Sequence, residues 1–222
     1  MTLNVTANTA LKHPSISYQK LKGAVQRGDI KTLKGMMQEG ADITETDDIG
    51  NTLLFQAVQG QHVEAVRILI ESGYIDVNHQ NSGGYTALMW AVDRNNETIV
   101  KLLVENGADV NICMDDYGWN ALFRAVQADK KGMVQLMVDH GADIEMRKKG
   151  EENAIDMANR LNNTAMADLL TDALESRRRK AEEKVKEEKA KLKKASDDAF
   201  SKKMQNLKKH VKPLKIKPGP QP

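Results

Sequence analysis

Apolar residues recur at three- and four-residue spacing through most of this chain, in short stretches separated by glycine and polar residues. In one stretch, Leu54, Ala57 and Val58 form a narrow apolar stripe. Residues 97–107, "ETIVKLLVENG", form a wider one. This spacing predicts amphipathic α-helices joined by tight turns. A single pair of such helices cannot bury both stripes, so further pairs must stack on it.

The pattern repeats every 33 or 34 residues. Three stretches align without a gap: "GNTLLFQAV" (50–58), "GYTALMWAV" (84–92) and "GWNALFRAV" (118–126). Each is followed by a longer apolar stretch and then by a glycine loop such as "GADVN" (107–111). Residues 20–43 and 153–170 fit the same frame less closely. Five units at a fixed period indicate a stacked repeat array.

Local signals place the ends of the helices within each unit. Thr52, Thr86 and Asn120 precede the first helical stretches, where their side chains can accept from free amides of the first turn. The second stretches end at glycines that we expect in the left-handed conformation; they are Gly73, Gly107 and Gly141.

These motifs resemble the ankyrin-repeat family over roughly residues 18–172. The family pattern is Gly-x-Thr-Pro-Leu-His-x-Ala-Ala, then Gly-His, Val-x-x-Leu-Leu and Gly-Ala-Asp-Val-Asn. The chain departs from it at the motif proline (Leu53, Ala87, Ala121) and the motif histidine (Phe55, Met89, Phe123), and Tyr74-Ile75 adds one residue to a loop. The resemblance implies an all-α solenoid of about five units, two of them caps. It also implies that His62 bonds a loop carbonyl.

In that family, residues beside the motif glycine and at the end of the first helix usually face partners. The resemblance therefore assigns partner binding to Ile49, Asn51, Gln59, Tyr85, Asp93, Arg94, Tyr117, Trp119 and Gln127, together with Trp90 and Arg124 inside the first helices. Trp, Tyr and Arg dominate the energetics of many interfaces. The alternative is that Trp90 packs between helices and Trp119 folds back over its own loop.

The charge distribution separates two parts of the chain. Residues 1–175 carry 16 basic and 25 acidic residues, whereas residues 176–222 carry 17 basic and 6 acidic ones. The acidic part suggests a basic or mixed-charge partner. We expect a disordered N-terminus at 1–14, the array at 15–174, a basic helix at 175–209 and a disordered tail at 210–222.

The basic helix has two interpretations. Its apolar residues, such as Val185, Leu192 and Met204, are too sparse for a confident coiled coil. An extended, partly solvated helix is therefore the first expectation, and weak self-association of an otherwise monomeric chain is the second. The run Arg177, Arg178, Arg179 and Lys180 could serve as a nuclear address or as a contact to nucleic acid or an anionic membrane.

Residue patterns typical of catalysis are missing. There is no Gly-rich phosphate loop, Cys/His cluster or Gly-x-Ser-x-Gly motif. Cys113 stands beside Asp115, and an acidic neighbour disfavours a reactive thiolate. We therefore expect no enzyme activity, no cofactor and no metal. The single cysteine and the lack of a long apolar run favour a cytoplasmic protein.

One modification site follows from the resemblance. "LVENGADVN" (103–111) resembles the ankyrin substrates of an asparagine hydroxylase, with Asn111 as the target and Asn78 as a poorer one.

The sequence thus predicts a non-catalytic adaptor that binds a protein partner through the concave ankyrin surface. One alternative is a rigid carrier whose basic tail binds nucleic acid or an anionic membrane. Another is a bacterial effector delivered into host cells.

Overall fold

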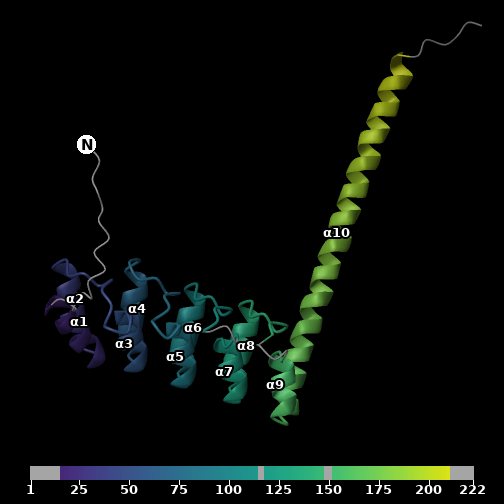
Figure 1. Cartoon of the computed structure of the whole chain (residues 1–222). Helices are drawn as coiled ribbons and strands as arrows, with labels where there is room; N and C mark the ends of the chain where they lie inside the picture. The colour runs from purple at the N-terminus through teal and green to yellow at the C-terminus, as the bar shows by residue number, and fades with distance from the viewer. Residues whose placement is uncertain (1–15, 115–117, 148–151, 211–222) are drawn as a thin grey trace, which may run out of the picture. The chain divides into compact units, whose positions relative to one another are not determined.

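The structure is a computed structural model that describes residues 16–114, 118–147 and 152–210, with side chains described from Ser17 to Asn206. These ranges contain ten α-helices and no β-strand (Figure 1). In chain order the helices are α1 (Ile16–Gln26), α2 (Ile30–Gln38), α3 (Leu53–Gln59), α4 (Val63–Glu71), α5 (Ala87–Asp93), α6 (Glu97–Glu105), α7 (Ala121–Gln127), α8 (Lys131–Asp139), α9 (Ala154–Arg160) and α10 (Thr164–His210).

The helices stack as five successive pairs. The first helix of each pair packs on the first helix of the next, in the order α1, α3, α5, α7, α9. The second helices α2, α4, α6 and α8 form a parallel row of contacts (Figure 1). This arrangement confirms the predicted all-α solenoid.

Small and branched residues of the first helices form the centre of the stack. Ala57, Ala91 and Ala125 are fully buried at equivalent positions, each followed by a buried valine. An alanine side chain lets two helix backbones approach closely, and the adjacent buried valine adds apolar surface to the same core. Because each stripe faces the next unit, the hydrophobic gain of burial depends on stacking.

Left-handed residues end the helices at the predicted places. Gly73, Gly107 and Gly141 have φ values of 72°, 88° and 92°, which confirms the prediction for the second helices. A further left-handed position separates the two helices of every pair, with φ between 53° and 67°, at Gly28, Gln61, Asn95, Asp129 and Asn162. Asn, Asp and Gly tolerate this conformation best.

Two of the three predicted helix caps form as expected. The side chain of Thr86 accepts from the amide of Met89 at 3.3 Å, and that of Asn120 accepts from the amide of Phe123 at 3.0 Å. The prediction for Thr52 is wrong, because its side chain makes no capping bond. Its Oγ1 is buried and has no hydrogen-bond partner in the described part of the chain.

Two asparagines bridge consecutive loops after the second helices. Asn78 donates to the carbonyl of Gly107 at 3.1 Å and accepts from the amide of Asp109 at 2.7 Å. Asn111 repeats both bonds one unit later, to Gly141 at 3.2 Å and Asp143 at 2.8 Å. The motif asparagine therefore holds two neighbouring loops together.

The chain divides into two compact units, residues 1–173 and 174–222, and α10 runs across the division. In the second unit, every described side chain from Arg178 to Asn206 is exposed. The large apolar side chains exposed there are Val185, Leu192, Phe200 and Met204. No helix in the described ranges is long and apolar enough to cross a membrane.

Two glycines with similar backbones should respond differently to alanine. Gly84 (φ 75°) lies against the carbonyl of Met114, which a Cβ would strike, whereas Gly107 (φ 88°) has no atom within 4 Å of that position. We expect Gly107→Ala to lower the free energy of unfolding by about 1 kcal/mol through backbone strain alone, and Gly84→Ala by about 3 kcal/mol. Urea unfolding of both variants measures the difference, and equal losses would contradict the close approach.

Candidate partner-binding surface

The loops before α3, α5 and α7, together with the C-terminal ends of these helices, form what we call the first-helix surface. Most of the residues predicted to bind a partner are accessible there. Ile49 is 58% exposed, and Gln59 and Gln127 are exposed at the ends of α3 and α7. Tyr117 lies outside the described residues. No interaction joins Ile49, Gln59 and Gln127 to one another in the described part.

Five of the predicted residues from two adjacent units come together in what we call the aromatic–arginine cluster: Tyr85, Trp90, Asp93, Arg94 and Arg124. The rings of Tyr85 and Trp90 meet edge to face, with centroids 6.2 Å apart. Arg94 lies 5.5 Å from the Trp90 ring centroid, and Arg124 lies 4.6 Å from that of Tyr85. Each aromatic face therefore carries a cation, an arrangement that is favourable in itself.

Arg124 is held by groups from the preceding unit. Its Nη1 donates to both carboxylate oxygens of Asp93, at 2.9 and 2.8 Å, and its Nη2 donates to the sulfur of Met114 at 3.3 Å. Its side chain is only 16% exposed, and its Nε is buried without a partner among the described residues. The guanidinium is therefore positioned before any partner arrives.

Arg94 and Trp90 keep unused hydrogen-bonding capacity. Arg94 is exposed and forms no ion pair with any described residue. The buried Nε1 of Trp90 also has no acceptor in the described part of the chain. A hollow of about 350 Å³ opens here, lined by Tyr85, Trp90, Asp93 and Arg94. The hollow therefore combines aromatic walls with an exposed guanidinium that has no ion pair in the described part of the chain.

The prediction that Asn51 faces a partner needs correction. Asn51 is 7% exposed, and its side chain donates to Asp47 at 3.2 Å and accepts from Asn81 at 2.8 Å. It joins consecutive loops and offers little to a partner. Trp119 is half-buried, with its ring 6.2 Å from that of Phe123, edge to face, on its own unit.

The structure contains a polar network around Asp47 that the sequence pattern did not predict. Asp47 accepts from the amides of Ile49 and Asn51 and from the side chains of Lys22 and Gln56. Gln56 is buried and also accepts from Gln26 at 2.8 Å. The position of Gln56 within an apolar helical stretch could have indicated such a network, because a buried glutamine side chain needs hydrogen-bond partners. The network ties the first unit to the second.

The other predicted residues have local structural contacts. The Nε2 of His62 lies 3.0 Å from the carbonyl oxygen of Gln26, so His62 contacts a backbone carbonyl as predicted, but one at the end of α1 and not in a loop. Asn111 and Asn78 use their side chains in the loop bridges described above, so a hydroxylase would have to open those bonds. Arg178 and Arg179 are exposed on α10, as is Lys180, and Arg177 is half-buried. The described residues contain no group of His, Cys, Asp and Glu arranged to hold a metal ion.

The stacked pairs agree with comparison to known families. A family model described as ankyrin repeats (3 copies) matches residues 21–114, and one described as ankyrin repeat matches residues 117–149. Together these cover more than half of the chain. The chain belongs to the ankyrin-repeat family. Ankyrin repeats are generally protein–protein interaction modules and are typically non-enzymatic.

Tyr18 gives the array a pH-dependent contact. Burial, and secondarily the carboxylate of Asp47, raises the pKa of Tyr18 far above its ordinary value of 10.0. Its hydroxyl donates to the carbonyl of Asn51 at 3.1 Å. A raised pKa in the folded state means that the unfolded chain loses this proton first. The stabilisation is therefore complete below about pH 10 and declines as the pH rises above it.

We accordingly expect Tyr18→Phe to reduce the alkaline loss of stability. At pH 7 the variant should lose about 1 kcal/mol of unfolding free energy, the typical worth of one hydrogen bond. Between pH 9.5 and 11 its stability should fall less steeply than that of the wild type. Urea unfolding at these pH values measures both slopes, and parallel slopes would exclude Tyr18 as the titrating group.

Proposed function

We propose that this ankyrin-repeat protein is a non-catalytic adaptor that binds a protein partner through the first-helix surface, with the aromatic–arginine cluster as the centre of the contact. The observation that carries the proposal is the pairing of Arg94 with Trp90 beside a hollow. An exposed guanidinium without an ion pair lies over an indole whose buried N–H lacks an acceptor. A partner carbonyl or carboxylate would supply an acceptor to the exposed guanidinium of Arg94.

The cluster has the physical properties of an interface centre. Trp, Tyr and Arg are the residues whose truncation most often weakens complexes. Asp93 and Met114 already restrain Arg124, so binding would cost less side-chain entropy at this position than at a free arginine. The surrounding array is acidic, with 16 basic and 25 acidic residues in residues 1–175. These features favour a partner segment of mixed charge, with an acidic group at the cluster and basic groups around it.

The basic second unit remains an alternative route to binding. Its exposed arginines and lysines could attract nucleic acid or an anionic membrane, and such binding weakens steeply as salt increases. Binding centred on the aromatic–arginine cluster should depend less on salt. Salt dependence therefore separates the two functions in one measurement.

The proposal can be tested with two matched charge reversals in the full-length chain. Arg94→Glu alters the cluster, and Arg67→Glu alters an exposed arginine on α4, whose ion pair with Glu64 is only a surface contact. Affinity capture from nuclease-treated lysate at 150 mM salt should retain a protein on the wild type and on Arg67→Glu. Arg94→Glu should retain at least tenfold less, since reversing one central charge costs more than 1.4 kcal/mol.

Three results would contradict the proposal. One is equal capture by Arg94→Glu and Arg67→Glu, and another is equal loss from both. The third is capture that disappears between 50 and 200 mM salt, which would favour the basic second unit. Both side chains are exposed, so neither charge reversal should unfold the chain, and thermal unfolding of both variants checks this.

A further inference from the structure

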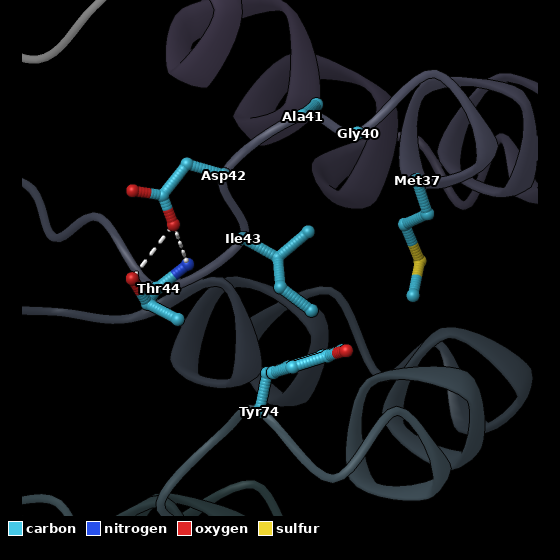
Figure 2. A pocket seen from close by; sticks show the side chains of 7 residues that line it. All are labelled: Met37, Gly40, Ala41, Asp42, Ile43, Thr44 and Tyr74. Carbon is cyan, nitrogen blue, oxygen red and sulfur yellow. Dashed lines mark hydrogen bonds between the residues drawn. The ribbon is translucent and has the colours of Figure 1, made fainter.

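A second hollow lies between the loops that follow α2 and α4 and shares no residue with the aromatic–arginine cluster. It has a volume of about 320 Å³ and is lined by Met37, Gly40, Ala41, Asp42, Ile43, Thr44 and Tyr74. Figure 2 shows the side chains of Met37, Ile43 and Tyr74 facing one space from three directions. Tyr74 is 76% exposed, an unusual state for a large aromatic side chain.

The hollow opens where the bridge between consecutive loops is missing. The two later junctions are closed by Asn78 and Asn111, but Thr44 occupies the equivalent position at the first junction. The hydroxyl of Thr44 is bonded to Asp42 in its own loop, at 2.6 Å (Figure 2). No hydrogen bond in the described part joins residues 40–44 to residues 73–78. The extra residue of the second loop, Tyr74, lies over this gap.

The chemistry of the hollow suits an apolar residue flanked by cations. Its walls are the side chains of Met37, Ile43 and Tyr74. The two segments that frame it, residues 34–45 and 70–79, carry five carboxylates and one lysine. The amide of Asp76 has no acceptor among the described residues, whereas that of Asp109 is bonded to Asn78. A peptide carbonyl could accept from the Asp76 amide.

The chain itself contains a segment of this chemistry. Twelve residues follow α10, and the first seven are "VKPLKIK" (211–217), in which lysines alternate with apolar residues. Pro213 and Pro218 disfavour a helix, so the sequence suits an extended ligand. We propose that residues 211–217 of a second copy of this chain dock in the hollow, with Leu214 or Ile216 between Met37, Ile43 and Tyr74. The adjacent lysines then meet the carboxylates of the rim.

This contact has a defined consequence for assembly. The hollow and the segment are different surfaces, so each chain can bind one neighbour and be bound by another. The association is head to tail, grows with concentration and has no fixed stoichiometry. It needs neither the first-helix surface nor its partner, and therefore does not depend on the proposed function.

Photocross-linking in the full-length chain tests the contact directly. The chain carries p-benzoylphenylalanine in place of Tyr74, and equal amounts of ¹⁴N- and ¹⁵N-labelled protein are mixed before irradiation. We expect mass spectrometry to find cross-links from position 74 to residues 211–217 that join a light chain to a heavy one. Cross-links confined to a single chain, to other segments only, or absent at about 0.5 mM protein would each overturn the proposal.

Sedimentation velocity across a concentration series supplies the second test. The double variant Leu214→Asp/Ile216→Asp changes residues that follow α10 in the sequence, so all ten helices keep their sequences, and it should associate at least tenfold more weakly than the wild type. Leu192→Asp is the matched control: it removes an exposed apolar side chain from α10, and it should associate like the wild type if the helices do not pair. Association that is lost in Leu192→Asp and kept in the double variant would instead indicate helix pairing and overturn the proposal.

The same series separates this inference from the proposed function. Arg94→Glu should associate like the wild type, because residue 94 lies in the aromatic–arginine cluster. If Arg94→Glu abolishes self-association while the double variant retains it, the contact between copies uses the first-helix surface, and the docking proposed here is wrong. Failure to capture a partner protein would leave the self-association result unaffected.

Discussion

The whole array depends on the burial of a narrow apolar stripe that no single helix pair can cover. Ala57, Ala91 and Ala125 occupy the same place on α3, α5 and α7, and each is fully buried against a neighbouring unit. Alanine lets the first helices approach closely enough for the flanking leucines and valines to exclude water. Stability is therefore shared between units, and damage at one junction weakens its neighbours.

Stacking also determines which side chains meet at the surface. Residues about 30 to 40 positions apart come into contact because each unit repeats the geometry of the last, so Arg124 reaches Asp93, 31 positions away, and the ring of Tyr85, 39 positions away. The same periodicity brings Asn78 to the Gly107 loop and Gln26 to Gln56. The backbone geometry repeats from unit to unit while the side chains differ, so each junction has its own set of polar and apolar contacts. The candidate binding surface and the loop bridges are two results of this arrangement.

The first two units differ most from the regular pattern. On one side of their junction, a polar network around Asp47 connects Lys22, Gln56 and Asn51. On the other side, Thr44 bonds to Asp42 within its own loop and does not form the bridge that asparagine makes elsewhere, and Tyr74 lengthens the facing loop. Polar bonds therefore close the junction near the first helices, whereas no hydrogen bond in the described part joins residues 40–44 to residues 73–78. The hollow lined by Met37, Ile43 and Tyr74 lies at this irregular junction.

The sequence by itself determined the repeat period, the all-helical class and the left-handed glycines, because these depend on local spacing and on backbone sterics. It also singled out the residues of the aromatic–arginine cluster, although only as members of a longer set. The tertiary structure decided that Arg124 pairs with Asp93, that Asn51 is buried and that the hydroxyl of Thr52 caps no helix. Such outcomes depend on how neighbouring units place one side chain against another at distances of a few ångströms. A pattern of residue types along one chain does not contain that information.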